Sequence, residues 1–294
     1  MNEYAIASFQ TPDKLLLQGL WLGPAKPATV YIFVHGLGST MFSQIELAQS
    51  LAAKDTAVLV FNNRGSGTIT GVKKVTNTKK GYTRETIGMA HEVFEECIND
   101  ISGAVSYAQA RGPRRIFLVG HSTGCQKSVY YLSKKKASAV AGAVLLAPMS
   151  DYATSAKEVP PKVLARAVAY ARKLVASGKS HDLLPLSVWP QLSDAQRFLS
   201  LNTPESVEEL FSYAVPKKKP RLLQSVRQPL LIVLAGDDEY ADRPNIEIAQ
   251  WFEQTTAKQE TQVVLMPNST HNFNGHDKEL KQHIVSWAAL RAKK

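Results

Sequence analysis

The feature that most constrains the fold of this chain is a serine that stands between two glycines at the end of an apolar run. Residues 116–119 are apolar and strand-forming, the sequence Gly120-His121-Ser122-Thr123-Gly124 follows directly, and 125–132 is helix-like. A sharp strand-to-helix turn would expose the Ser122 hydroxyl and crowd its backbone, so the flanking positions need glycine. The pattern predicts a nucleophile elbow, with Ser122 at a helix N-terminus that stabilises negative charge.

Strand-like and helix-like segments alternate along the rest of the chain. We expect helices at 41–53, 85–109, 245–254 and 277–290, and a mobile loop or small excursion over the polar residues 68–83. Strands are expected at 4–9, 15–22, 30–34, 57–61, 115–119, 140–146, 230–235 and 261–266. This alternation predicts an α/β fold with an approximately eight-stranded, mostly parallel sheet flanked by helices.

The composition changes between residues 152 and 228. This segment has little strand character, and seven prolines divide it into short pieces. Helical spacing is present at 163–175, 193–200 and 205–213. We therefore expect a helical cap at 152–228, inserted after the sixth strand, and a core formed by 1–151 and 229–294.

Candidate partners of Ser122 follow other predicted strands, whose carboxyl ends share one edge of a parallel sheet. Asp238 follows 230–235 and His271 follows 261–266, which gives the order serine, acid, histidine. We expect Ser122 as the nucleophile, His271 as its base and Asp238 as the acid that orients the base. The alternatives are Asp237 or, more weakly, Asp151 for the acid, and His276 for the base. His121 is expected to turn away and pack beside the sheet.

Two glycine-containing loops follow earlier strands. The sequence His35-Gly36-Leu37-Gly38 resembles an oxyanion loop, which implies that the backbone N–H groups of Leu37 and Thr123 stabilise the oxyanion. The sequence from Asn62 to Gly67 resembles an Asp-x-Arg-Gly-x-Gly turn with asparagine in the first position. We expect this turn to support the elbow from behind.

The formal net charge of +10 raises the question of an anionic partner. The basic residues form short, separate runs without interleaved aromatic residues, so we expect no nucleic-acid binding. These runs are Lys79-Lys80, Lys134-Lys135-Lys136, Lys217-Lys218-Lys219 and Arg291-Ala292-Lys293-Lys294. The remaining functional interpretation of the charge is a preference for an anionic small-molecule substrate.

Other compositional features restrict location and cofactors. No apolar run approaches the roughly 20 residues that cross a bilayer, and residues 1–10 lack a secretory signal pattern. Cys97 and Cys125 do not form a Cys-x-x-Cys pair, which favours a reducing, cytoplasmic setting. We expect no metal or organic cofactor. The sequence leaves the oligomeric state open, a homodimer included.

Taken in order, these motifs resemble the α/β-hydrolase superfamily over nearly the whole chain. The segments 195–201, 208–212 and 236–240 also resemble the cap and acid loop of a fungal and bacterial group that includes siderophore esterases and is otherwise of unknown function. The resemblance implies a serine hydrolase that cleaves a carboxylic ester through an acyl-enzyme. The alternatives are a serine peptidase or amidase with the same triad, and a binding protein that kept the fold without catalysis.

Overall fold

The computed structural model describes residues 4–135 and 139–291. Residues 1–3 of the N-terminal segment and Lys136, Ala292, Lys293 and Lys294 of the basic runs lie outside the described residues. Among the described helices, none is long and apolar enough to cross a membrane.

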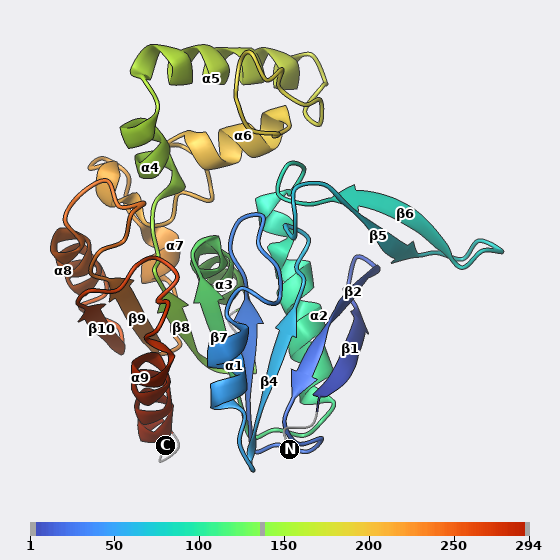
Figure 1. Ribbon diagram of the computed structural model, residues 1–294. Coiled ribbons are helices and arrows are strands. Elements are labelled where there is room, and N and C mark those ends of the chain that lie inside the picture. The colour runs from blue at the N-terminus through green and yellow to red at the C-terminus, as the bar shows by residue number, and fades with distance from the viewer. Residues whose placement is uncertain (1–3, 136–138, 292–294) are drawn as a thin grey trace.

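A ten-stranded sheet forms the centre of the described structure (Figure 1). Six neighbouring strands run parallel in the order β10-β9-β8-β7-β3-β4, and β2 joins β4 antiparallel, with β1 antiparallel to β2. The eight expected strands are β1 (Tyr4–Gln10), β2 (Leu15–Leu22), β3 (Thr29–Val34), β4 (Thr56–Phe61), β7 (Arg115–His121), β8 (Val140–Leu146), β9 (Leu230–Ala235) and β10 (Thr261–Met266). The central strands are continuous apolar runs because helices cover both faces of the sheet.

The two further strands form a hairpin where a loop and the start of a helix were expected. β5 (Thr70–Val75) pairs with β6 (Tyr82–Ile87), and β5 extends the sheet from the first residues of β2. The hairpin projects away from the body of the molecule (Figure 1). Its strand residues are exposed or half-buried and none is fully buried, so its sequence carries no apolar run that would reveal a strand. The helix predicted from residue 85 begins only with a 3₁₀ turn at Phe94–Glu96 and then α2 (Cys97–Gln109).

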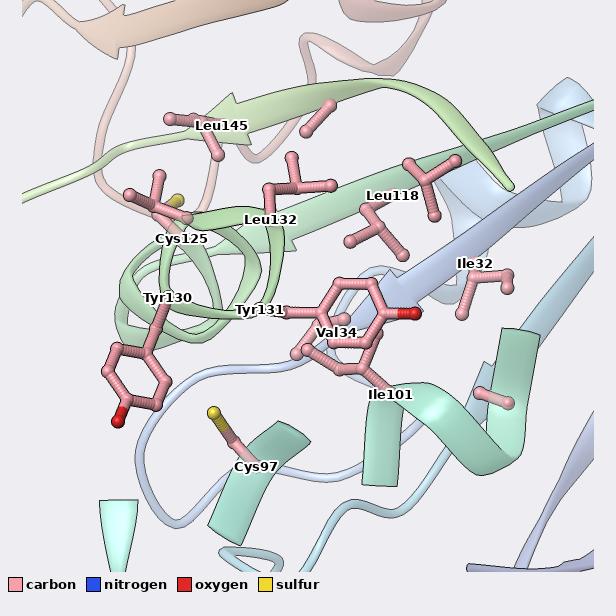
Figure 2. Packing of buried hydrophobic residues seen from close by; sticks show 14 of the residues in the cluster. Ile32, Val34, Cys97, Ile101, Leu118, Cys125, Tyr130, Tyr131, Leu132 and Leu145 are labelled. Carbon is pink, nitrogen blue, oxygen red and sulfur yellow. The ribbon is translucent and has the colours of Figure 1, made fainter. Parts of the chain in front are cut away.

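Helices cover the two faces of the sheet and bury two separate apolar clusters. On one face α1 (Ile45–Leu51), which is shorter than predicted, packs beside α9 (Asp277–Leu290). The other face is covered by α2, α3 (Thr123–Lys134) and α8 (Asn245–Thr255). Figure 2 shows part of the second cluster, where Ile101 of α2 and Tyr131 of α3 lie near Val34 of β3. This packing holds α3, and with it the elbow, against the sheet.

Three helices lie beyond the carboxyl ends of the strands (Figure 1). They are α4 (Asp151–Glu158), α5 (Pro161–Ala176) and α6 (Ala195–Asn202). Residues of α5, of α6 and of the segment between these two helices form a small apolar cluster of their own, made of Ala167, Ala171, Leu184, Trp189, Ala195 and Phe198. This separate cluster is consistent with a capping unit above the sheet.

The later part of the predicted insertion is organised differently. The expected helix at 205–213 is wrong: the structure has turns and a 3₁₀ helix, Ser212–Ala214, followed by the short α7 (Arg221–Gln224). Leu210 and Phe211 pack into the main cluster, where the Phe211 ring contacts Phe252 of α8 edge-on. Tertiary packing therefore overrides local helical spacing here.

Candidate active site

Ser122 occupies the turn between β7 and α3. Its φ is +54° and its ψ −128°, an unusual conformation for a residue with a side chain. The backbone N–H of Ser122 donates a hydrogen bond to the carbonyl of Leu146 at 3.0 Å, which ties the turn to β8. Such strain persists where the surroundings enforce it, as at functional sites. The sharp strand-to-helix turn predicted from the sequence is confirmed.

The two glycines flanking the serine are required by close backbone contacts. A Cβ on Gly124 would lie 1.9 Å from the carbonyl oxygen of Val34, and one on Gly120 would lie 2.4 Å from that of Gly124. The backbone cannot yield at these contacts because β3 and α3 are packed into the core. The steric reason given for both glycines is therefore confirmed.

Asp238 and His271 lie together although they are 33 positions apart in the chain. The Asp238 carboxylate oxygen Oδ2 is 2.8 Å from Nδ1 of His271, and both side chains are almost completely buried. The second oxygen of Asp238 accepts the backbone N–H of Tyr240 at 3.0 Å. With Nδ1–H donating to the carboxylate, a neutral His271 keeps the lone pair on Nε2.

The alternative residues occupy other environments. Asp237 is exposed, and its backbone N–H donates to the Ser269 carbonyl. His276 precedes α9, where Nε2 lies 3.2 Å from the Asn268 carbonyl oxygen and Nδ1 lies 3.5 Å from Glu279. Asp151 accepts a hydrogen bond from the Gln126 amide at 2.9 Å. The structure thus pairs Asp238, and not Asp237 or Asp151, with His271.

Three residues near His271 were not predicted as part of the site. His121 does not pack away from it: its Nε2 donates to the His271 carbonyl at 2.9 Å, and the two rings lie 5.0 Å apart. Burial, followed by the nearby His271, lowers the pKa of His121 to about 4, so its ring is neutral near pH 7. Glu239 accepts the His271 backbone N–H at 3.0 Å, and the Tyr240 ring meets the imidazole edge-on. The adjacent sequence Asp238-Glu239-Tyr240 was the available signal for the last two.

The loop after β3 lies directly against Ser122. A Cβ on Gly36 would stand 2.8 Å from the Cβ of Ser122 and 3.3 Å from its Oγ. In the described part of the chain, the backbone N–H groups of Leu37 and Thr123 have no hydrogen-bond acceptor. Thr123 is the first residue of α3, where helix N–H groups lack intrahelical partners. Two such donors beside a serine can stabilise a negative oxygen.

A cavity of about 400 Å³ joins these groups beneath α4 and the segment before α6. The floor of the cavity is lined by Ser122, His271, Gly36 and Leu37. One wall is formed by residues 189–193, of which Trp189 and Leu192 are apolar. The polar wall is one face of α4, formed by Asp151, Thr154, Ser155 and Glu158. All lining residues fall in the described ranges, and none of them is a lysine or arginine.

Asp151 is the acidic group deepest in this wall. Burial, and then the negative charge of Glu208, raise its pKa to about 8. The neighbouring Arg197 opposes this shift but does not cancel it. Asp151 is therefore mainly protonated near pH 7 and can donate a hydrogen bond into the cavity.

Comparison with known proteins shows which family the chain belongs to. The sequence pattern of DUF1749, described as a protein of unknown function, matches residues 80–289. The chain belongs to the DUF1749 family. A curated relative of this DUF1749 chain, an uncharacterized abhydrolase domain-containing protein of Dictyostelium discoideum, is 26% identical over 146 residues. That match covers 49% of the chain but only 14% of the relative.

Solved structures of low sequence identity share the fold of this DUF1749 protein. The siderophore hydrolase EstB of Aspergillus fumigatus is 19% identical with a TM-score of 0.66, and each chain is covered to 95%. The esterase Pf2001 of Pyrococcus furiosus is 19% identical with a TM-score of 0.59, covering 97% of this chain and 90% of its own. Est1E of Butyrivibrio proteoclasticus, solved with ferulic acid, is 14% identical with a TM-score of 0.66, covering 98% and 100%. The fold is that of the α/β hydrolases, as predicted.

Proposed function

We propose that this DUF1749 protein is a serine hydrolase that cleaves carboxylic esters through an acyl-enzyme. The observation that carries the proposal is the 2.8 Å contact between Asp238 and Nδ1 of His271, whose ring lines the same cavity as Ser122. An acid that orients a histidine, a serine on a strained elbow and free backbone N–H donors form a complete set of groups for acyl transfer.

In the proposed reaction, Nε2 of His271 takes the Ser122 proton as Oγ attacks the acyl carbonyl. The resulting oxyanion receives hydrogen bonds from the N–H groups of Leu37 and Thr123. When the tetrahedral intermediate collapses, the bond to the leaving oxygen breaks and His271 returns the proton to the alcohol. Water, deprotonated by His271, then attacks the acyl-enzyme carbonyl; the bond to Ser122 Oγ breaks as the second tetrahedral intermediate collapses, and His271 returns the proton to Oγ, which releases the carboxylic acid and restores Ser122. Asp238 holds the imidazole in the required tautomer throughout.

The cavity lining bears on the charge of the substrate. The net charge of +10 suggested an anionic substrate, but the cavity offers two carboxyl groups and no lysine or arginine. Asp151 and Glu158 lie two turns apart on one face of α4, so they flank a substrate over roughly 10 Å. An anionic group there would meet the Glu158 carboxylate, and the cavity lining offers no lysine or arginine to balance it. We therefore propose an ester that is neutral or positively charged.

A fluorophosphonate probe tests whether the serine is active. We expect intact-mass measurement to show one label on the wild type and none on Ser122→Ala. A known serine hydrolase in the same tube controls for the probe. Absence of label on the wild type would favour the non-catalytic alternative.

Substrate panels separate the remaining alternatives. p-Nitrophenyl esters of graded acyl length, with neutral, ammonium-bearing and carboxylate-bearing acyl groups, are compared with aminoacyl anilides. We expect ester hydrolysis that Ser122→Ala abolishes, and slow or no anilide cleavage. Faster cleavage of the anilides would make the protein a peptidase or amidase.

A further inference from the structure

The cap sequence contains a buried arginine that the proposed mechanism does not use. The side chain of Arg197, on α6, is fully buried, and its guanidinium contacts Glu208 through both terminal nitrogens, at 2.5 and 3.2 Å. One of these nitrogens also lies 3.1 Å from Oε2 of Glu92, which belongs to the core. The Arg197 side chain therefore forms ion pairs with both the cap and the core.

Glu92 carries this connection to the helix that begins at the elbow. Its other oxygen, Oε1, lies 2.6 Å from Nζ of Lys127 on α3, and both side chains are fully buried. Burial by itself would raise the pKa of Glu92, but the charges of Lys127 and Arg197 outweigh it and lower that pKa. The Glu92 carboxylate also accounts for the glycine at position 65, because a Cβ there would lie 2.5 Å from a carboxylate oxygen.

Asn63 links Lys127 to the loop beside Ser122. The Asn63 side-chain oxygen lies 3.3 Å from Nζ of Lys127, and its amide nitrogen donates to the His35 carbonyl at 3.1 Å. The Asn63 backbone N–H donates to Nε2 of His35 at 3.1 Å, while Nδ1 donates to the Gly36 carbonyl at 2.9 Å. Burial lowers the pKa of His35 to about 4, so the ring is neutral and Nε2 can accept.

We propose that Arg197 is a positioning residue for the oxyanion loop, residues 35–38, and acts on it through Glu92, Lys127 and Asn63. This inference rests on the proposed function, because it assigns the loop a part in the same reaction. Two cations, Arg197 and Lys127, balance the carboxylates of Glu92 and Glu208. Taking such charges out of water offsets much of their attraction, so the set adds little net stability but fixes the relative positions of its members.

The oxyanion forms only as the ester reacts. Displacement of the oxyanion loop therefore affects the transition state and not the binding of the ester. A donor that engages only in the transition state lowers kcat and kcat/KM together when it is displaced, with little effect on KM. Loss of one entire donor lowers kcat by about 10²- to 10³-fold. Because a shift of the loop weakens the donor without removing it, we expect a smaller effect, of about 10-fold.

The test variant is Arg197→Lys, which keeps the charge but replaces the two-nitrogen contact with Glu208 by a single nitrogen on a shorter side chain. Its matched control is Arg172→Lys, since Arg172 forms an exposed ion pair with Glu205 on the same cap. kcat is expressed per active site titrated with the fluorophosphonate. We expect Arg197→Lys to lower kcat about 10-fold with KM unchanged within 2-fold, and to weaken binding of a boronic acid that mimics the tetrahedral adduct by a similar factor. The control should match the wild type.

A double variant and hydrogen exchange distinguish positioning from general destabilisation. Asn63→Ser cuts the connection next to the loop, so adding Arg197→Lys to it should lower kcat by less than the product of the single effects. Peptides covering the loop should exchange amide hydrogens faster in Arg197→Lys than in the control. Should Arg197→Lys fail to fold, Glu208→Gln, which loosens Arg197 from the opposite side, carries the same expectations.

An unchanged kcat per titrated site, together with unchanged exchange in the loop, would overturn this inference even if the wild type hydrolyses esters. Failure of the wild type to take up the probe would instead overturn the proposed function. The inference about Arg197 is therefore tested on the Arg197→Lys variant, whereas the proposed function is tested on the wild type.

Discussion

The carboxylate of Asp238 lies 2.8 Å from Nδ1 of His271, whereas Asp237, its neighbour in the chain, is exposed to solvent. Adjacent residues with the same side chain thus have different environments because the backbone turns between them after β9. Asp238 is held on both oxygens, by His271 and by the Tyr240 N–H. Such a carboxylate can fix the imidazole tautomer and stabilise the imidazolium that forms during the reaction.

Asp238→Asn should lower kcat by up to about 10⁴-fold, because an asparagine amide can donate to Nδ1 and shift the ring proton to Nε2. Asp237→Asn removes the same charge one residue earlier and should retain most of the activity. Ester hydrolysis by both variants, normalised to circular dichroism as a check on folding, gives the comparison. Greater loss in Asp237→Asn would contradict the assignment of the acid.

Gly124→Ala should prevent formation of the native elbow, because the added Cβ would lie 1.9 Å from the Val34 carbonyl oxygen in a rigid part of the core. Gly71→Ala is the control, since a Cβ there meets only the end of Arg84, at 3.6 Å. We expect soluble, folded protein from the control and little or none from Gly124→Ala. Measured yields and melting temperatures check this, and a native-like, active Gly124→Ala would show that the elbow can relax.

Glu158→Gln should raise KM for an ammonium-bearing ester by about 2- to 5-fold at low ionic strength and leave KM for a neutral ester unchanged. The reason is that Glu158 lies exposed at the outer end of the acidic face of α4. Glu253→Gln, on the exposed side of α8, changes the net charge equally and serves as the control. Equal effects of the two variants would mean that overall charge, and not the cavity, selects the substrate.

Asp151→Asn should stabilise the protein increasingly as the pH rises. Burial, followed by Glu208, raises the Asp151 pKa to about 8, so the folded wild type must hold a proton that the unfolded chain has already released above pH 4. The wild type therefore loses stability between about pH 4 and pH 8, where the variant has no proton to hold. We expect the difference in unfolding free energy to grow by about 1 kcal/mol per pH unit.

Urea denaturation of both proteins at pH 5, 6, 7 and 8 measures this difference. Glu209, another buried carboxyl whose pKa is raised to about 7, remains in both proteins and cancels in the comparison, as do Arg197 and Lys127. A difference that stayed constant with pH would show that Asp151 is ionised in the folded protein throughout this range.

The strand-helix alternation, the elbow and the order of the candidate residues could all be predicted from the amino-acid sequence. Each of these features depends on residues that are close together in the sequence. Gly120 and Gly124 are needed because a side chain would clash within a single turn, and apolar runs such as 230–235 indicate strands that are buried on both faces of a sheet. The helix predicted at 205–213 was wrong, and the segment 68–83, predicted as a mobile loop or small excursion, contains strands of a projecting hairpin, since partners distant in the chain decide those segments. Leu210 packs into the main cluster, and β5 pairs with β2.

The sequence could not predict which side chains from distant parts of the chain come into contact, because the folded arrangement sets those contacts. It paired Asp238 with His271, turned His121 towards His271, and left the cavity acidic in a chain of net positive charge. It also joined Arg197 to Glu92, 105 positions earlier in the sequence. A buried charged group needs an oppositely charged or hydrogen-bonding partner because water is excluded. The sequence shows which charged residues are present, but it does not show which of them the fold brings into contact.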